Sequence, residues 1–162
     1  MVLHSIEPVF DKCSEILILG SFPSVLSRER GFFYAHPQNR FWKVLASLFD
    51  EKVPISTEKK KDFLLKHRIA LWDVIASCDI VGSSDNSIEN AVANDLSEIL
   101  CVANIREIFV NGRKADELFK KHIRECIGKE AIYLPSTSPA NASWTLEKLI
   151  KAWSVVREKN NE

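Results

Sequence analysis

The chain has 162 residues, enough to bury a substantial hydrophobic core, and we expect a single domain over residues 1–162. Its 22 basic and 22 acidic residues cancel, which argues against a protein held to nucleic acid mainly by bulk positive charge but leaves room for local basic patches. No apolar run approaches the roughly 18 residues that a membrane span needs. The beginning of the chain has acidic residues and no basic, apolar leader, so we expect a soluble, cytoplasmic protein that does not contact a membrane.

The cysteines and glycines exclude the common cofactor sites. Cys13, Cys78, Cys101 and Cys126 are widely spaced, with no C-x-x-C pair, which argues against a structural zinc or iron–sulfur site. They are typical of reduced, mostly buried thiols in an intracellular protein. The chain has neither G-x-G-x-x-G nor G-K-[ST], and no paired His and acid spacing suggests a metal. We therefore expect no metal and no cofactor.

The first third of the chain centres on one strand and one long loop. Residues 1–14 are predicted to be a polar lead-in. Residues 16–19 are continuously apolar, which is typical of a central parallel strand buried on both faces. The loop at 20–38 that follows is rich in aromatic and small polar side chains, and loops of this length are usually functional. Apolar residues then recur at helical spacing, which predicts a helix over 40–49.

The middle of the chain predicts a second strand between helices. Thr57 is a favourable N-cap for a helix at 58–66, whose lysine run reads as a solvated face. Residues 69–72 are predicted to be a strand that leads into Asp73, and residues 77–86 are loop-like. Asn94 is a favourable cap for a helix at 95–102.

The last third repeats the alternation of strand and helix. Strands are predicted at 107–110 and 131–134, a helix at 113–123, and a final helix from about 143 to 157. An Asn-Gly turn at 111–112 and a polar, proline-containing loop at 135–142 follow the two strands. Short apolar strands alternating with helices predict the α/β class, here a three-layer α/β/α sandwich on a central four-stranded parallel sheet.

Every unusual loop follows the carboxyl end of a predicted strand. In parallel sheets of this class, ligands bind beyond those ends, so the four loops should line one cleft. No Ser-His-Asp set is readable in them, and the side chains that they offer are amides, hydroxyls and aromatic rings. Such groups suit a flat heterocycle that is stacked on a ring and read at its edge.

Three segments in these loops resemble a known family. They are G-S-F-P-S at 20–24, Y-A-H-P-Q-N-R-F-W at 34–42 and L-P-S-T-S-P-A-N at 134–141. Together they resemble the uracil-DNA glycosylase superfamily, and most closely its hypoxanthine-DNA (deoxyinosine) glycosylase branch. The segment at 36–44 is also similar to the mismatch-specific uracil glycosylases. The resemblance covers nearly the whole chain, and it implies the glycosylase fold and its strand order.

The catalytic residue that the resemblance implies is Asn39. In the uracil-specific branches, an Asp or Asn after the first strand positions the attacking water, and Phe22 stands at that place here. A His often opens the loop after the fourth strand in those branches, and Leu134 stands there. In the hypoxanthine branch, the catalytic amide is the Asn of P-x-N-R-F-W, which maps onto Asn39. These departures favour deoxyinosine over uracil.

The resemblance also implies residues that bind the base and the DNA. Tyr34 matches the position whose ring stacks on the flipped base, and Asp73 falls near the base-reading position, where a carboxylate can accept the N1–H of hypoxanthine. Ser21 and Phe22 complete the expected base-binding set. The loop at 135–142 matches the segment that enters the minor groove. The expected DNA contacts are Ser24, Ser136, Ser138, Pro139, Asn141 and Arg113, with Arg28, Arg30, Arg40 and Lys114 as further phosphate ligands.

We therefore expect a monofunctional DNA glycosylase that excises hypoxanthine from DNA by hydrolysing the N-glycosidic bond, which initiates base excision repair. Its partner is DNA with deaminated bases, and we expect a monomer. An amide is a poor general base, so Asn39 should orient the water more than deprotonate it. No lysine in the motif loops stands as a Schiff-base nucleophile, so no lyase activity is expected.

Other readings remain open at this point. The chain resembles a mismatch-specific uracil-DNA glycosylase as well, and a non-catalytic DNA-lesion-binding module or a nucleoside hydrolase would fit the same fold. Asn39 and Asp73 can each serve as plain helix caps. His36 reads as a structural loop residue, and Ser136, Ser138 and Asn141 as turn formers.

Overall fold

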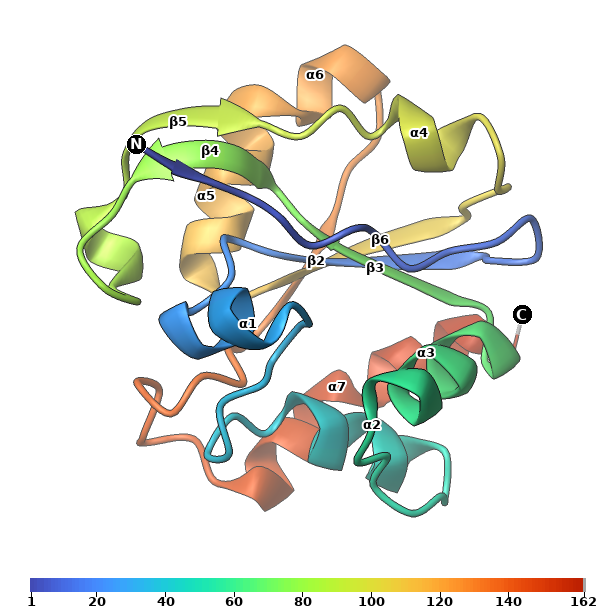
Figure 1. The fold of residues 1–162 in the computed structure, drawn as a ribbon. Helices are drawn as coiled ribbons and strands as arrows, with labels where there is room; N and C mark the ends of the chain where they lie inside the picture. Colours follow the sequence, from blue (N-terminus) through green and yellow to red (C-terminus); the bar gives the residue numbers. More distant parts are fainter. Residues whose placement is uncertain (162) are drawn as a thin grey trace.

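The centre of the computed structural model, which describes residues 1–161, is a four-stranded parallel sheet (Figure 1). Its strands are β2 (Ile16–Gly20), β3 (Ile69–Asp73), β6 (Glu107–Asn111) and β7 (Ile132–Leu134), in the order β3-β2-β6-β7. Ile16 lies opposite Ile69 on one side and Glu107 on the other. β2 is buried at every position, because it has a strand on each side and helices over both faces. The predicted four-stranded parallel sheet is confirmed.

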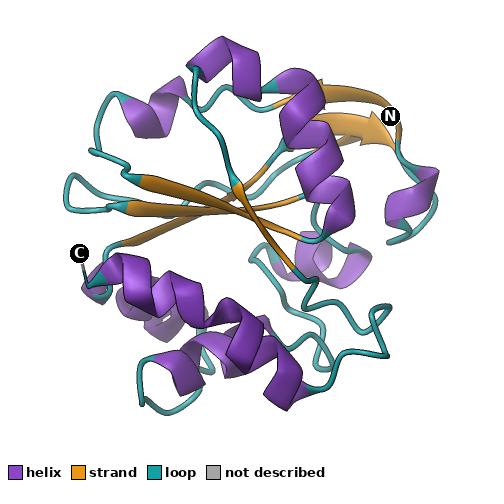
Figure 2. Cartoon of the chain, turned by 180° about the vertical axis from the view of Figure 1, so that it is seen from behind, coloured by secondary structure: helices purple, strands orange, loops and turns teal. Residues whose placement is uncertain are grey.

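Helices cover the two faces of this sheet, which confirms the three-layer α/β/α sandwich (Figures 1 and 2). One layer holds α2 (Phe41–Leu48), α3 (Thr57–Lys66) and α7 (Leu146–Asn160). The opposite layer holds α4 (Ser97–Leu100), α5 (Arg113–His122) and α6 (Arg124–Ile127). The short helix α1 (Val25–Arg30) lies beyond the carboxyl end of β2, in the long loop.

A second, smaller sheet corrects two predictions. It is antiparallel and consists of β1 (Val2–Leu3), β4 (Ile75–Asp79) and β5 (Glu89–Ala93) in the order β1-β4-β5, with a 3-10 turn, η1 (Asp85–Ser87), between β4 and β5. The prediction of a plain lead-in at 1–14 is wrong, and so is the loop predicted to begin at residue 77. Only Val74 separates β3 from β4, so the sequence has no loop there that would mark the start of a second strand.

Three helix starts also differ from the predictions. Ser56, not Thr57, caps α3, since its hydroxyl accepts the Lys59 N–H at 3.1 Å. Asn94 caps nothing, because its side chain donates to the Asp73 carbonyl at 2.9 Å. The last helix begins at residue 146, after Thr145, rather than at 143. Ser, Thr and Asn residues stand in clusters near these helix starts, and the sequence does not distinguish which of them accepts the helix N–H.

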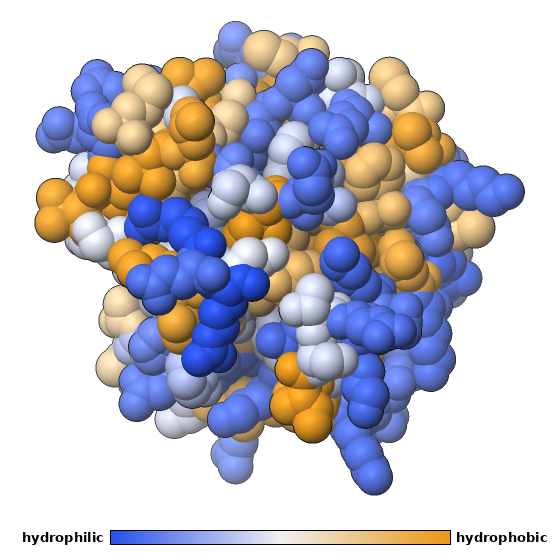
Figure 3. All heavy atoms as spheres, in the orientation of Figure 1, coloured by the Kyte–Doolittle hydropathy of each residue, from blue (hydrophilic) through white to orange (hydrophobic). Residues whose placement is uncertain are grey.

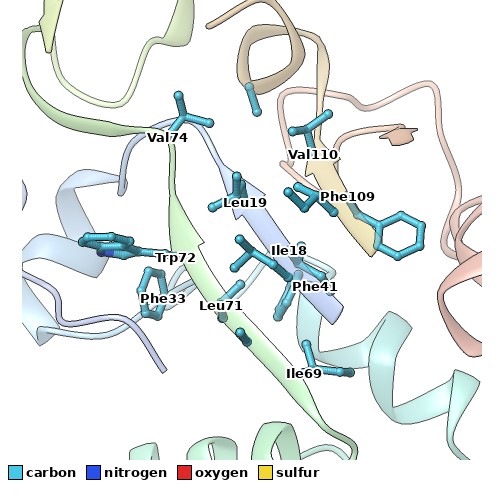
Figure 4. Packing of buried hydrophobic residues seen from close by; sticks show 14 of the residues in the cluster. Ile18, Leu19, Phe33, Phe41, Ile69, Leu71, Trp72, Val74, Phe109 and Val110 are labelled. Atoms are coloured by element: carbon cyan, nitrogen blue, oxygen red, sulfur yellow. The ribbon is translucent and has the colours of Figure 1, made fainter. Parts of the chain in front are cut away.

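The core joins the sheet to the α2–α7 layer, and it extends to the loop after β7. Figure 4 shows Ile18, Leu71 and Phe109 of three neighbouring strands packed near Phe41 of α2. Trp153 of α7 is fully buried, with its ring edge-on to Phe41 at 5.9 Å between centroids. Its indole N–H donates to the Pro135 carbonyl at 2.9 Å. A core side chain therefore anchors the beginning of the loop at 135–142.

The surface differs from the prediction at the cysteines. Cys13, Cys101 and Cys126 are exposed free thiols, and Cys78 is buried, so the prediction of mostly buried thiols is wrong. Leu3 of β1 is an exposed apolar side chain. Apolar atoms gather in the upper left of Figure 3, where Figure 1 shows the small sheet. Within residues 1–161, no helix combines the length and the apolar character that crossing a membrane requires.

We predict that Trp153→Phe lowers the free energy of unfolding by about 2 kcal/mol, because the buried Pro135 carbonyl loses its donor and a small cavity remains. Chemical denaturation checks this value. Trp144→Phe is the matched control, since that indole is only half-buried and, among the described residues, its N–H has no partner. Equal destabilisation by the two changes would contradict the anchoring role of Trp153.

Candidate active site

The loops beyond the carboxyl ends of the four parallel strands surround one cavity of about 330 Å³. Its wall combines the segment at 20–24 after β2, Asp73 of β3, Asn111 of β6 and the segment at 136–140 after β7. The predicted convergence of the four strand ends is therefore confirmed. The volume lies within the range of small-molecule pockets and suits a single small, flat ligand group.

Asn39 lies in the cavity wall and also stabilises the start of α2. Its side-chain Oδ1 accepts the Phe41 N–H at 2.9 Å, and its own N–H donates to the His36 carbonyl at 3.0 Å. The N-cap of α2 is Arg40, so Asn39 is not the helix cap; it stands one residue earlier and binds the first helical N–H, which does not conflict with a role in the cavity. Since the hydrogen bond from the Phe41 N–H fixes Oδ1 toward the helix, only the two Nδ2 hydrogens of Asn39 remain to bind a ligand, and among the described residues no group accepts them.

Tyr34 is held rigidly beside Asn39. One face of its ring stacks on Phe41, with centroids 4.1 Å apart and planes 20° apart, and its hydroxyl accepts a hydrogen bond from Asn111 Nδ2 at 3.2 Å. Its backbone has a φ of 52°, in the left-handed region that side-chain-bearing residues rarely occupy. Burial, and next the charge of Asp73, raise the pKa of the Tyr34 hydroxyl far above its ordinary value, so the phenol stays protonated.

Asp73 is the last residue of β3, and it is buried. Its Oδ2 lies 2.8 Å from His4 Nε2, and both side chains are almost entirely shielded from solvent. The alternative in which Asp73 caps a helix is wrong, because β4 follows it after Val74. His4 reaches this position from the N-terminal segment, which the sequence alone predicts to be a lead-in.

Gly20 allows the polar groups of the cavity to meet. A Cβ at this position would lie 2.4 Å from Asp73 Oδ1 and 2.8 Å from the Tyr34 hydroxyl oxygen, both closer than real Cβ contacts. The missing side chain at the end of β2 is thus what lets the carboxylate and the phenol approach the central strand.

A second carboxyl group, that of Asp85, enters the wall from η1. The Ser21 hydroxyl donates to Asp85 Oδ1 at 2.8 Å. Much of the Asp85 residue is exposed, but its carboxyl end lies in the cavity wall, where burial, and next the charge of Asp73, raise its pKa above the ordinary value. The Ser21 hydrogen bond and the charge of Lys114 oppose this shift. The two carboxyl groups of the cavity therefore have different environments.

Asn111 ties the loop after β7 to the end of β6. Its buried side chain donates to Thr137 Oγ1 at 3.0 Å and accepts the Thr137 N–H at 3.1 Å. Since the same Nδ2 also donates to Tyr34, one amide connects the loop to the aromatic wall of the cavity. The sequence predicts only a turn at this position.

Arg40 holds the same loop from the α2 side. Its Nη2 donates to the carbonyls of Ser138 at 2.9 Å and Asn141 at 3.1 Å, and its Nη1 donates to the Trp144 carbonyl. Arg28 is engaged similarly, with the Gly82 carbonyl at 2.7 Å. The prediction that Arg40 and Arg28 serve as phosphate ligands is not supported, because these guanidinium groups already bind backbone carbonyls.

The hydroxyl and amide residues predicted to contact DNA shape their own loops. Ser24 caps α1, and Asn141 Nδ2 donates to the Ser136 carbonyl at 3.0 Å. The hydroxyls of Ser136 and Ser138 accept N–H groups two residues further along the chain, both at 3.1 Å. The turn-former interpretation is therefore right for these residues, and their contact with DNA stays a prediction.

The remaining predicted residues fall in different places. Phe22 is buried in the cavity wall, where its ring meets the edge of His4 at 5.9 Å between centroids. Pro139 lines the cavity. Arg113 is exposed at the start of α5 and does not line the cavity. Among the described residues, no cluster of three or more His, Cys, Asp or Glu side chains could hold a metal ion.

Three residues of the site are missing from the sequence-based prediction: His4, Asp85 and Asn111. Asn111 follows a predicted strand directly, and that position is the one signal that could have identified it. His4 and Asp85 carry no such signal, since His4 follows a strand of the small antiparallel sheet that the sequence does not predict, and Asp85 lies in a predicted loop that follows no strand of the predicted parallel sheet. The resulting arrangement offers a ring face, a carboxylate, a second carboxyl group and an amide to one flat molecule.

Comparison with known proteins agrees with this geometry. The sequence model of the uracil DNA glycosylase superfamily matches residues 7–157. Among relatives named hypoxanthine DNA glycosylase, one from Methanosarcina acetivorans is 38% identical over 143 residues, which are 87% of this chain and 89% of that protein. Another, from Methanosarcina barkeri, is 35% identical over 136 residues, 83% of this chain and 85% of that protein.

A solved structure extends the likeness to the whole fold. It is the solution NMR structure of a Methanosarcina acetivorans protein provisionally described as a uracil DNA glycosylase, with a TM-score of 0.84, 33% sequence identity and coverage of 100% of both chains. The family match over most of the chain, the two relatives and this structure lead to one conclusion: the chain belongs to the uracil DNA glycosylase superfamily.

Proposed function

We propose that this protein is a monofunctional DNA glycosylase that removes hypoxanthine from deoxyinosine in DNA by hydrolysing the N-glycosidic bond, the first step of base excision repair. The observation that carries the proposal is the position of Asn39, whose unpartnered amide hydrogens share one cavity with Tyr34 and Asp73. The two relatives named hypoxanthine DNA glycosylase support the choice of base.

The target base must leave the DNA stack before it can enter the cavity, at a cost of a few kcal/mol that is smaller for a mispaired base. Inside, it stacks on the ring face of Tyr34 that Phe41 leaves free. Because Phe41 and the bond from Asn111 fix that ring, little side-chain freedom is lost when the base binds.

The Asp73 carboxylate distinguishes hypoxanthine from adenine. Deamination converts purine N1 from an acceptor into an N–H donor, and a carboxylate binds a donor but repels the lone pair of adenine N1. His4 occupies Asp73 Oδ2, so the free Oδ1 beside Gly20 is the oxygen that accepts the base N1–H. Undamaged adenine is thereby disfavoured in the cavity.

Bond cleavage follows from the position of Asn39. The Nδ2 hydrogens hold a water against the sugar C1′, the bond from C1′ to the base N9 breaks with its electron pair remaining on the base, and the water oxygen bonds to C1′ and releases a proton to solvent. The amide orients the water without acting as a strong base. None of the described residues that line the cavity is a lysine, which supports hydrolysis without a Schiff base and lyase step.

The protonated form of Asp85 assists the departure of the base. Its raised pKa keeps a share of the carboxyl groups protonated at a pH where an ordinary aspartate is ionised. Such a group can donate to the purine acceptors O6 and N7 while charge develops on the base. The protein then works as a monomer without a metal or cofactor, because its own side chains and water supply every step.

The first test uses end-labelled duplexes that carry one deoxyinosine or one deoxyuridine. The wild-type protein should produce alkali-sensitive sites at inosine and no breaks without alkali. Asn39→Ala should lower the single-turnover rate about 100-fold, since one oriented polar group at the reacting centre is lost. Asn39→Asp is the matched control, because it keeps an oxygen for the Phe41 N–H but removes the amide hydrogens.

Loss of cleavage in both variants, with the melting temperature of Asn39→Asp unchanged, supports the catalytic role. Full activity of Asn39→Ala would contradict it. Cutting at uracil that equals or exceeds cutting at inosine would move the assignment to the mismatch-specific uracil glycosylases, and DNA binding without any breaks would indicate a non-catalytic module.

The pH dependence of the rate tests Asp85. Because only the protonated carboxyl donates, the wild-type single-turnover rate on deoxyinosine should fall as pH rises through the raised pKa of Asp85. Asp85→Asn keeps an oxygen for the Ser21 hydroxyl but cannot release a proton, so the rate should fall about 100-fold at the acidic end and lose this dependence. An identical pH profile in the two proteins would contradict the role.

The loop after β7 gives a further prediction. The Arg40 guanidinium is planar and binds several loop carbonyls at once. In Arg40→Lys a single ammonium takes its place, so the loop at 137–144 should lose its fixed shape. We expect KM for the duplex substrate to rise about 10-fold while kcat changes little. Lys43→Gln, on the exposed side of α2, is the control for charge alone. An unchanged KM in Arg40→Lys, which keeps the positive charge, would mean that Arg40 acts only through charge and not through its hydrogen bonds to the loop.

A further inference from the structure

The buried pair of His4 and Asp73 is more than a packing contact. The ring nitrogen Nε2 of His4 lies 2.8 Å from Asp73 Oδ2, and the two side chains are only 3% and 5% exposed. His4 does not line the cavity, whereas Asp73 does. The histidine therefore stands behind the carboxylate, on the side away from the space where a base would bind.

The second ring nitrogen of His4, Nδ1, determines which of the two nitrogens carries the hydrogen. The Ile6 N–H donates to His4 Nδ1 at 3.3 Å, so Nδ1 carries no hydrogen and acts as an acceptor. In the neutral ring, the hydrogen must then be on Nε2, from which it is donated to Asp73. The backbone of the N-terminal segment thus selects the tautomer that makes Asp73 an acceptor-only carboxylate.

The surroundings leave the His4 ring little freedom. It meets the rings of Phe22 and Trp72 edge-on, at 5.9 and 6.3 Å between centroids. The backbone N–H of His4 donates to the Ala76 carbonyl at 2.7 Å, which ties the N-terminal segment to β4. The Trp72 indole N–H donates to the Ile6 carbonyl at 3.3 Å, which ties it to β3.

Asp73 is fixed from two further directions. Asn94 donates to its backbone carbonyl at 2.9 Å, and Oδ1 lies against Gly20, where a Cβ would come within 2.4 Å. Among the described residues, no hydrogen-bond donor is paired with Oδ1. One carboxylate oxygen is thus committed to His4, and the other is held toward the cavity with its lone pairs free.

We propose that His4 is a positioning residue that sets base selectivity, because its Nε2–H holds Asp73 as a carboxylate acceptor whose Oδ1 reads the N1–H of the flipped purine. This inference rests on the proposed glycosylase function and deepens it. It makes the N-terminal segment part of the base-reading site, although that segment lies outside all three glycosylase-like motifs.

The test compares two purines that differ at the atom being read. Deoxyinosine has an N1–H, whereas deoxynebularine, which carries unsubstituted purine, has none. Single-turnover rates and KM are measured on duplexes with either base, and the selectivity is the ratio of the two kcat/KM values. His4→Phe keeps a ring of similar size without the N–H, and it should lower this ratio about 10-fold or more, because a hydrogen bond to a charged group is lost.

A conservative variant separates positioning from packing. The amide nitrogen of glutamine reaches about as far as histidine Nε2, so His4→Gln should retain most of the selectivity, whereas the shorter His4→Asn should lose it. This pair decides the question with stably folded proteins even if the phenylalanine variant does not fold. In an Asp73→Asn background, changing His4 should leave the ratio unaltered, since the carboxylate is already gone.

A ratio that stays unchanged in His4→Phe and His4→Asn, with both substrates slowed equally, would overturn the proposal and leave His4 a structural residue. Failure of the proposed function looks different, because the wild-type protein would then cleave neither substrate. Wild-type cleavage of deoxyinosine together with unaltered selectivity in the His4 variants would refute the inference about His4 alone.

Discussion

The close approach at Gly20 is the constraint on which the cavity depends. The end of the central strand has no side chain, and this is why the Asp73 carboxylate and the Tyr34 hydroxyl can both stand within contact distance of its backbone. Any Cβ there would displace one of the two. The neighbouring charge of Asp73 in turn helps to keep the phenol protonated, so Tyr34 offers a neutral aromatic face and Asp73 the negative group.

The sequence was sufficient for the parts of the fold that come from local patterns. Residues 16–19 and 69–72 read as buried parallel strands because their side chains are apolar without alternation, and the position of Asp73 at a strand end followed from that. The small sheet has no comparable pattern. β1 has two residues, and β5 exposes polar and apolar positions alike, so pairing with β4, and not the local sequence, is what makes each of them a strand.

The residues of the site also fall into those that local sequence predicts and those that only tertiary contacts bring together. Asn39 and Tyr34 lie in one motif-bearing segment after β2, and their neighbourhood in the cavity follows from chain connectivity. Asp85 is brought to the cavity wall by its contact with Ser21, 64 residues away along the chain, and His4 is brought behind the wall by its contact with Asp73, 69 residues away. No spacing rule in the sequence predicts such pairs. Arg40 shows the converse error. A basic residue in a DNA-binding motif suggests a phosphate ligand, but the guanidinium donates to the carbonyls of Ser138 and Asn141, which also accept backbone N–H groups of the same loop.

The protein has no net charge, so its electrostatic attraction for DNA depends on where its basic residues lie. Arg28 and Arg40 donate to neutral backbone carbonyls, so their N–H groups are engaged but their positive charge remains. Lys60 of α3 lies near Arg30 of α1: burial, and next the charge of Arg30, lower the pKa of Lys60. The Lys60 ammonium also lies 5.3 Å from the Trp42 ring centre. Basic groups thus accumulate beside α1, over which Figure 3 shows strongly hydrophilic atoms. Under the proposed function, these basic groups attract DNA phosphates beside the loop that carries Tyr34 and Asn39.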